Sequence, residues 1–453
     1  MSNKRSGFIK LFFIVLGIST MLQAMPAASR ITLPSGKKIF AVGMNLAWIN
    51  YAGDVGNTAI DTSKFDKPMK DIADSGANCM RIWLSTDGTH DPVYSSTTGL
   101  VTGAGTQTVA NIQKMLKLAK KHNLVLVLVL LTHNWVNKSI DQTILANNKK
   151  MLTTDAGLQA YIDNYLVALV KAIGNDPNLL CWEIFNEPEG MVDGWSSPKN
   201  TITQAQVQKA VNWIAAAIHT NVPNVLVSNG AASLGTMSWY TDNALSTVGT
   251  KTNGVLDFYM AHYYGWNGTS NSPFTKTYAS WNLDKPLIIG EYASTSWSKS
   301  TSSSSPMQDG ANVDTLLTYL DKVGYAGGMG WQYQQDAGDP WMKGFPTFGH
   351  SMAQAFRADS ASIKLAGASN TFKENLVNVR PSSIPFKRIG NRLYWASPSP
   401  QAKASLMNLQ GRVFHPAIMD NSVSLAAIPS GVYFFVVNNQ GAIQAWKFNV
   451  ANK

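Results

Sequence analysis

Cysteine is almost missing from this chain, which has two in 453 residues, Cys79 and Cys181. A disulfide framework is therefore excluded as the basis of the fold. Both cysteines lie in apolar runs that we predict to be the second and fourth strands of one sheet. Strands spaced about 4.8 Å apart would hold their Cα atoms about 10 Å apart. Because that separation is beyond disulfide reach, we expect two buried free thiols.

Charged residues are also scarce, at 14% of the chain, and the formal net charge of +10 is unevenly spread. Residues 361–453 contain ten lysines and arginines against two acidic residues, a balance of +8, and Lys4, Arg5 and Lys10 add three more positive charges. Residues 11–360 therefore sum to −1. The basic residues are scattered and accompany no nucleic-acid-binding motif, so we expect no nucleic-acid partner.

No apolar run reaches the roughly 18 unbroken residues that a membrane-spanning helix needs. The apolar run at residues 11–22 follows the basic residues near the N-terminus and precedes small residues at Ala24 and Ala28. This pattern predicts a signal peptide over residues 1–24 and a secreted protein. The alternative is an N-terminal anchor that is not cleaved.

The chain does contain a regular alternation of two kinds of segment. Several apolar runs lack polar residues almost entirely, which is typical of parallel strands buried on both faces. There are eight such β-rich runs, at residues 37–45, 78–84, 124–134, 179–187, 224–230, 255–264, 285–292 and 325–333. Stretches with apolar residues at helical spacing lie between them, at residues 114–123, 160–174, 206–220 and 311–324.

Eight such β-then-α repeats predict a (β/α)8 TIM barrel over residues 30–357. The alternative, an open doubly wound sheet, would carry a phosphate-binding glycine motif, which is missing. Residues 358–384 are rich in Ser, Ala and Asn and are predicted to be a linker. Short β-like pieces separated by Gly, Pro and Asn follow, so residues 385–453 are predicted to form a small β-sandwich domain.

Polar residues collect at the ends of the predicted strands, which in a barrel of this kind meet at one rim and form the site. They are Asn45, Arg81, His133, Asn134, Asn186, Glu187, His262, Tyr264, Glu291, Trp331 and Gln332. No pair of histidines, cysteines or carboxylates has the spacing of a metal site. We therefore expect neither a metal nor another cofactor.

Two carboxylates stand out in this set. Glu187, in the stretch WEIFNEPEG, and Glu291 each end an apolar strand. Opposite walls of a barrel rim can hold two carboxyl groups about 5–5.5 Å apart, the separation that retaining glycosidases use. Arg81 and Tyr264 are candidates to keep Glu291 ionised, because a cation and a hydrogen-bond donor favour the charged form. Glu187, beside His262, is the candidate for a raised pKa and for the role of the acid.

The ordered set of Arg81, His133, Asn186-Glu187, His262-x-Tyr264, Glu291 and Trp331 resembles glycoside hydrolase family 5 over residues 37–356. The resemblance implies that Glu187 is the general acid/base and Glu291 the nucleophile. It also implies that Asn186 contacts the sugar 2-hydroxyl, that Arg81 and Tyr264 orient Glu291, and that His262 lies beside Glu187. In this scheme His133 and Trp331 line the subsite on the non-reducing side.

Loop sequences at residues 43–56 and 81–103 resemble a bacterial and invertebrate group of β-mannanases within that family. We therefore expect a retaining endo-β-1,4-mannanase that acts on plant-type β-mannan as a monomer. Trp48 and Trp135 are expected to expose aromatic faces to sugar rings. The alternatives are an endo-β-1,4-glucanase that acts on β-glucan and a surface protein that binds glycans without cutting them. Ser85 stands where this group would carry a bulkier polar residue.

The C-terminal region resembles the sorting and surface-attachment domains of gliding-type bacterial secretion systems, through the segments SLMNLQGRVF and GVYFFVVNNQG. A partner in the secretion machinery or at the cell surface is the implication. The alternative is a carbohydrate-binding module that stacks sugars on Trp395, Tyr433 and Trp446. In the barrel, Glu183 is expected to be a paired structural acid, and Glu189 and Asp257 to be hydrogen-bond partners.

Overall fold

The computed structural model describes residues 29–194, 199–265, 271–293, 296–297, 304–305, 316–334 and 344–365, and the strands between residues 386 and 450 with residues 425, 428 and 429. The predicted signal peptide and most of the predicted linker lie outside these residues. The chain divides into two compact units, residues 1–372 and 373–453. Each unit is considered by itself.

The first unit is built on a closed barrel of eight parallel strands in the order β10-β11-β14-β3-β4-β7-β8-β9. Every predicted β-rich run contains one of them, which confirms the (β/α)8 barrel and excludes the open sheet. The strands are β3 (Ala41–Asn45), β4 (Cys79–Trp83), β7 (Val125–Thr132), β8 (Leu179–Asn186), β9 (Val227–Ala231), β10 (Tyr259–Tyr263), β11 (Leu287–Ala293) and β14 (Gly327–Trp331).

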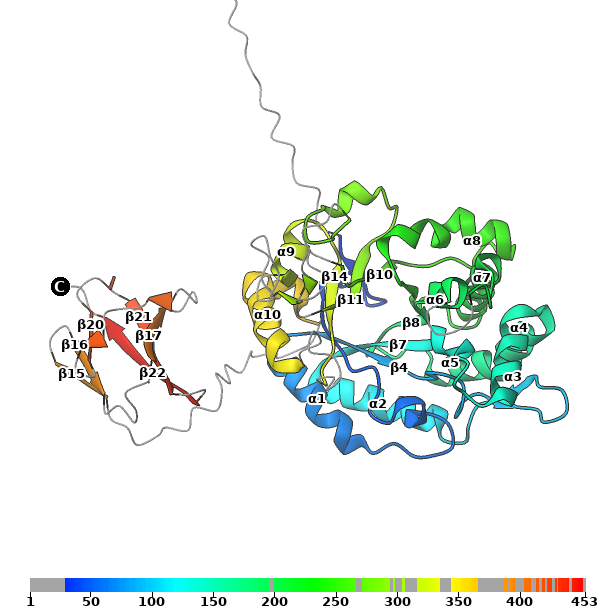
Figure 1. The fold of residues 1–453 in the computed structure, drawn as a ribbon, viewed down its shortest axis with the longest axis horizontal. Helices are drawn as coiled ribbons and strands as arrows, with labels where there is room; N and C mark the ends of the chain where they lie inside the picture. The colour runs from blue at the N-terminus through cyan, green and yellow to red at the C-terminus, as the bar shows by residue number, and fades with distance from the viewer. Residues whose placement is uncertain are drawn as a thin grey trace, which may run out of the picture. The chain divides into compact units, whose positions relative to one another are not determined.

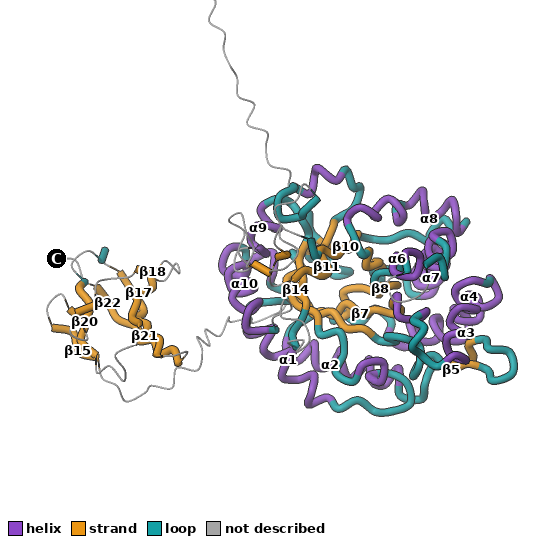
Figure 2. Tube along the Cα trace, viewed as in Figure 1, coloured by secondary structure: helices purple, strands orange, loops and turns teal. Residues whose placement is uncertain are grey.

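Helices surround the strands in the described part of the unit (Figure 1). The same arrangement appears in Figure 2, where the purple helices lie outside the orange strands. The helices are α1 (Thr62–Asp74), α2 (Thr108–His122), α3 (Gln142–Thr153), α4 (Asp155–Tyr161), α5 (Val167–Ile173), α6 (Glu189–Asp193), α7 (Gln204–Asn221), α8 (Asp242–Gly249), α9 (Leu316–Lys322), α10 (Phe345–Ala358) and α11 (Ser360–Ile363).

Shorter elements lie in the loops of this unit. A π-helical turn, η3 (Ile162–Leu166), joins α4 to α5, and four 3₁₀ turns occur at η1 (Tyr51–Asp54), η2 (His133–Val136), η4 (Leu234–Tyr240) and η5 (Tyr278–Trp281). The small strand pairs are β1 (Ile31–Thr32) with β2 (Lys38–Ile39), β5 (Val93–Tyr94) with β6 (Val101–Gly103), and β12 (Ser296–Trp297) with β13 (Ser304–Ser305).

Local sequence explains where several helices begin and end. Helix α7 opens with a capping box, in which the Thr203 hydroxyl accepts from the Gln206 amide and the Gln206 side chain accepts from the Thr203 amide. Helix α2 ends at Asn123, whose φ of 55° is the left-handed conformation that Asn tolerates. These signals fix the helix lengths between consecutive barrel strands.

Alternation along the strands places an apolar layer inside the barrel below the polar rim. Cys79, Val127, Cys181 and Met260 belong to this inner cluster and are buried completely. Both cysteines are free, as predicted. Because side chains of a strand alternate between faces, the residue two positions after Cys79, Arg81, also points inward, one layer nearer the carboxyl end.

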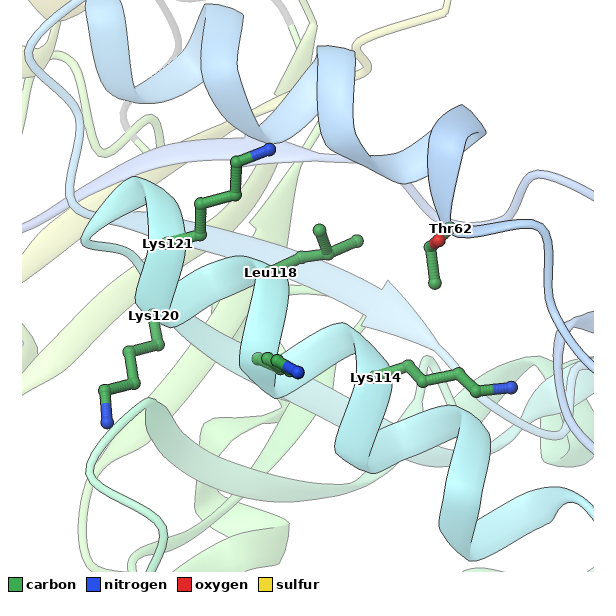
Figure 3. Close-up of a pocket in the computed structure, with 6 residues that line it drawn as sticks. Thr62, Lys114, Leu118, Lys120 and Lys121 are labelled. Carbon is green, nitrogen blue, oxygen red and sulfur yellow. The ribbon is translucent and has the colours of Figure 1, made fainter.

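An open groove of about 870 Å³ lies on the outside of the barrel unit. It is lined by Thr62 at the start of α1 and by four lysines and Leu118 of α2 (Figure 3). The groove therefore belongs to the outer ring of helices and includes none of the strand-end residues.

The second unit contains two four-stranded antiparallel sheets, with strand orders β15-β16-β20-β19 and β18-β17-β21-β22. Tyr433, which a carbohydrate-binding module would need exposed, is buried; the side chains of Trp395 and Trp446 lie outside the described residues. The strands are β15 (Phe386–Ile389), β16 (Arg392–Trp395), β17 (Lys403–Asn408), β18 (Val413–Phe414), β19 (Ile418–Met419), β20 (Ser422–Ser424), β21 (Gly431–Asn439) and β22 (Ala442–Val450).

The buried Asn78 joins three segments at the amino end of the barrel. Its side-chain oxygen accepts from the Val42 amide at 2.9 Å, and its Nδ2 donates to the carbonyls of Phe40 and Ile363 at 2.9 and 2.7 Å. Asn78→Ala should lower the free energy of unfolding by about 3 kcal/mol, because each lost buried hydrogen bond costs about 1 kcal/mol. Urea titration followed by circular dichroism measures the change.

The control is Asn271→Ala, which changes the same residue type at an exposed position. A surface substitution of this kind should stay within about 0.5 kcal/mol of the wild type. Equal midpoints for the two variants would show that Asn78 does not hold the barrel base together.

Candidate active site

Glu187 and Glu291 meet at the carboxyl end of the barrel. Glu187 directly follows β8, and Glu291 lies in β11. One oxygen of each carboxyl group lies within 4.8 Å of the other. The sequence analysis expected this pair from two strand ends more than a hundred residues apart, and the structure brings the two acids together.

Glu187 has an unusual backbone conformation, with φ at 49°. A non-glycine residue in this left-handed region is strained by the order of 1–2 kcal/mol. The Glu187 amide donates to the Gly230 carbonyl at 2.7 Å, so the neighbouring strand β9 holds the conformation in place. This backbone conformation turns the chain out of β8 at Glu187.

Arg81 is completely buried, and each of its five N–H groups donates a hydrogen bond. Its Nε and Nη2 donate to the two oxygens of Glu183, both at 2.6 Å. The other three bonds go to Asn45 Oδ1 at 2.8 Å, Glu291 Oε1 at 2.6 Å and Asn186 Oδ1 at 2.7 Å. Glu183 is thus the paired acid that the sequence analysis predicted.

Tyr264 and His262 surround the second oxygen of Glu291. The Tyr264 hydroxyl donates to Glu291 Oε2 at 2.5 Å. His262 Nδ1 lies 3.5 Å from the same oxygen and 2.9 Å from Glu187 Oε1, so this ring nitrogen stands between the two acids. His133 Nδ1 lies 3.8 Å from Glu187 Oε2.

Burial is the main electrostatic influence on both acids and raises the pKa of Glu187 and of Glu291 above the ordinary value. At Glu291 the Arg81 guanidinium and the Tyr264 hydroxyl act in the opposite direction. Glu187 accepts no hydrogen bond from Arg81 or Tyr264. The hydrogen bonds therefore favour Glu187 as the holder of a proton shared by the pair, which is the role that the sequence analysis expected of it.

Burial lowers the pKa of both histidines at the site. The pKa of His262 falls to about 4, and that of His133 also lies below its usual value. Both rings are therefore neutral at neutral pH, and His262 can exchange a hydrogen bond with Glu187 without adding a charge. This leaves Arg81 as the cation in contact with the carboxylates.

Asn186 is anchored through one half of its amide. Its Oδ1 accepts from Arg81, whereas its Nδ2 is buried without a hydrogen-bond partner among the described residues. A buried donor left unpaired costs about 1–3 kcal/mol. A ligand hydroxyl could satisfy this donor.

An aromatic cluster covers one side of the rim. Trp48 and Trp331 pack against the buried Trp83, with ring centroids 5.1 and 5.5 Å from it. Tyr51 meets Trp48 edge-on at 5.2 Å and is 41% exposed. The sequence analysis missed Trp83 and Tyr51, although Trp83 lies two residues after Arg81 and so faces the same interior.

Trp135 does not belong to this cluster. Its side chain is completely buried, its Nε1 donates to the Ser85 carbonyl at 2.7 Å, and its ring packs edge-on against Tyr161. The expectation that Trp135 exposes a face to sugars is therefore wrong. The residue follows a strand end, but the 3₁₀ turn η2 directs the ring into the core.

Glu189 and Asp257 are hydrogen-bond partners, as predicted. Glu189 is buried and accepts hydrogen bonds from the Ala232 amide and from the hydroxyls of Thr236 and Tyr240. Asp257, at the amino end of the barrel, accepts from the Val227 amide at 2.6 Å. These contacts satisfy both carboxyl groups away from the Glu187–Glu291 pair.

Glu187, His262 and Glu291 are also close enough together to share a cation, a possibility that no spacing in the sequence indicates. However, both oxygens of Glu291 already accept hydrogen bonds, from Arg81 and Tyr264. A carboxylate held in this way suits attack on carbon better than coordination of an ion.

A closed (β/α)8 barrel with two facing carboxylates at its carboxyl rim is an arrangement that retaining glycoside hydrolases use. The family model described as "Cellulase (glycosyl hydrolase family 5)" matches residues 35–337. The chain therefore belongs to glycosyl hydrolase family 5.

Individual relatives agree with this membership. The chain is 30% identical over 333 residues to a mannan endo-1,4-beta-mannosidase of Cryptopygus antarcticus, a match covering 66% of this chain and 81% of the relative. The β-1,4-D-mannanase crystal structure from that organism superposes with a TM-score of 0.64 at 26% identity, covering 75% of this chain and 97% of that one. An endo-1,4-β-mannanase of Eisenia fetida gives a TM-score of 0.62 at 28% identity, covering 71% and 92%.

Proposed function

We propose that this protein is a retaining endo-β-1,4-mannanase that hydrolyses internal bonds of plant-type β-mannan. The observation that carries the proposal is the approach of the Glu187 and Glu291 carboxyl oxygens to within 4.8 Å. Inverting glycosidases keep their two carboxyl groups about 6.5–9.5 Å apart to admit a water molecule, whereas retaining enzymes keep them about 5–5.5 Å apart.

In the first step, a Glu291 oxygen attacks the anomeric carbon while Glu187 gives its proton to the leaving glycosidic oxygen. The C–O bond to the leaving sugar breaks as the bond to Glu291 forms, which yields an ester to the enzyme and a shortened chain. Burial raises the pKa of Glu187, which suits it to hold that proton.

In the second step, Glu187 is a carboxylate and takes a proton from water, whose oxygen attacks the same carbon. Glu291 leaves as a carboxylate, and Glu187 is protonated again for the next cycle. Two inversions at one carbon retain the β configuration. The chemistry needs no metal or other cofactor.

The residues around the pair have distinct tasks in this proposal. Arg81 and Tyr264 orient Glu291 by one hydrogen bond to each oxygen. The free Nδ2 of Asn186 donates to the sugar 2-hydroxyl, and His262 holds Glu187. His133 and Trp331 line the subsite on the non-reducing side, and Trp48 extends the aromatic wall beyond it.

The choice of β-mannan rests on the relatives, whose names specify mannan or mannanase. The family description "Cellulase" keeps β-glucan as the second candidate substrate. A glycan-binding protein without activity is the third possibility, and the hydrogen bonds that support both acids argue against it.

We also propose that the protein acts as a monomer and that it is exported. The signal-peptide pattern of residues 1–24 supports export. None of the helices in the described part of the chain is long and apolar enough to cross a membrane. Mass spectrometry of protein from the culture medium should find a mature N-terminus near residue 25, and a retained leader would contradict export by cleavage.

The C-terminal unit is proposed to be a β sandwich that serves in sorting or surface attachment. Buried residues from both sheets, among them Leu393, Leu406 and Phe435, form one apolar cluster, which supports face-to-face packing. Ending the chain after residue 372 should leave activity on soluble substrate intact and change its distribution between cells and medium. An unchanged distribution between cells and medium would contradict the proposed role in attachment.

The substrate prediction is tested by comparing reducing-end release from galactomannan and from soluble cellulose. We expect the rate on galactomannan to exceed that on soluble cellulose at least about tenfold, a difference of about 1.4 kcal/mol in transition-state binding. A faster rate on cellulose would identify a glucanase. Binding to both polymers without any reducing ends would identify the non-catalytic protein.

The two acids should respond differently to truncation. Glu291→Ala should lower kcat at least about 10⁴-fold on all substrates, because no covalent intermediate can form. Glu187→Ala should lower kcat/KM on mannan about as strongly but spare kcat/KM on aryl glycosides, which reports the first step and whose leaving groups need little protonation. The measurements are kcat and kcat/KM on both substrates, and proton NMR of the first product should show the β-anomer.

Near-normal turnover by the Glu291→Ala enzyme would exclude Glu291 as the nucleophile. An α-anomer as the first product would exclude retention whatever the variants do. Asp257→Ala is the matched control, because this acid bonds the Val227 amide away from the pair. It should leave the ratio of kcat/KM between the two substrates unchanged.

A further inference from the structure

Arg81 makes more hydrogen bonds to Glu183 than to Glu291. Two N–H groups form a bidentate ion pair with Glu183, and one N–H group reaches Glu291. Glu183 and Arg81 are both completely shielded from solvent. Among the described side chains, Arg81 is the hydrogen-bond donor to both oxygens of the Glu183 carboxyl group.

The charges of Arg81, Glu183 and Glu291 together set the net charge around the reacting carbon. Arg81 contributes one positive charge, and its two ion-pair partners Glu183 and Glu291 contribute one negative charge each. This group of three side chains therefore carries a net charge of −1 before reaction. Without the Glu183 charge it would be neutral, and Arg81 would neutralise Glu291 instead.

We propose that Glu183 is a positioning residue for the reaction, which counters the charge of Arg81 so that the site keeps a net negative charge facing the cationic sugar of the transition state. The inference rests on the proposed function. Arg81 is needed for its five donors, which fix Glu291, Asn186 and Asn45. Its positive charge, however, destabilises an oxocarbenium-like transition state, and the negative charge of Glu183 offsets this destabilisation.

The surroundings of Glu183 are shaped to hold it there. A Cβ atom on Gly230 would lie 2.2 Å from Glu183 Oε1, so the absence of a side chain at Gly230 makes room for the carboxylate. The Gly230 carbonyl also accepts the hydrogen bond from the Glu187 amide. In addition, the charge of Glu183 raises the pKa of both Glu187 and His262.

Glu183→Gln in the full-length enzyme tests the inference. Because a negative charge is removed beside both acids, the acid and basic limbs of the kcat/KM profile should both move to lower pH, by roughly 0.5 to 1 unit. At the optimum, kcat should fall about 10²-fold, as for other losses of preorganised charge. A purely structural role would lower activity without moving either limb.

Inhibitors of matched size separate charge from shape. A cationic mannose-like iminosugar should bind Glu183→Gln at least about tenfold more weakly than the wild type, while neutral mannobiose should change less than about twofold, since only the cation senses the lost charge. Equal losses for the two ligands would overturn the inference.

Glu189→Gln is the matched control, because it removes another buried carboxylate close to Glu187 in sequence whose hydrogen bonds lead to Thr236 and Tyr240 instead of to the pair. Its pH limbs and its ratio of cationic to neutral inhibitor affinity should match those of the wild type. Equal shifts in Glu183→Gln and Glu189→Gln would show a general effect of buried charge and contradict a specific role for Glu183.

Glu183→Asp keeps the negative charge on a shorter side chain. It is the test variant if Glu183→Gln does not fold. It should restore both pH limbs and the preference for the cationic inhibitor, even where kcat stays low, and failure to restore them would refute the inference. An inactive wild type on every polysaccharide would instead reject the proposed function. The two failures are therefore distinguishable.

Discussion

The buried guanidinium of Arg81 is the constraint on which the rest of the site depends. A charge removed from water is tolerated only when its partners are nearly perfect, and here each of the five N–H groups has one. Those partners come from β3, β8 and β11, so the barrel must close before the arginine can be satisfied. Folding and assembly of the site are in this sense the same event.

The barrel and the ordered set of strand-end residues were predictable because both depend on short-range patterns. Apolar runs at regular spacing give eight strands, and parallel strands leave their last polar residues on one rim. Glu187 and Glu291 could be paired from this topology without knowledge of any distance. The pairing of Glu183 followed from its place inside an apolar strand, where a lone acid would be too costly.

The details that escaped prediction depend on side-chain direction and shared charge. Trp135 and Trp48 both follow strand ends, yet a 3₁₀ turn buries the first and the open rim leaves the second half-exposed. Burial raises the pKa of Glu291 as well as that of Glu187, because desolvation acts on both acids whatever their roles. The spacing of residues in the sequence indicates neither the direction of a turn nor the depth at which a side chain is buried.

The three hydrogen bonds of Asn78 also fix where the described part of the barrel unit ends. They fasten Ile363, near the last described residue of the barrel unit, to the segments that lead into β3 and β4. These segments lie at the amino ends of the strands, whereas the carboxylates lie at the carboxyl ends. The last described residues of the barrel unit therefore lie at the opposite end of the barrel from the pair of carboxylates.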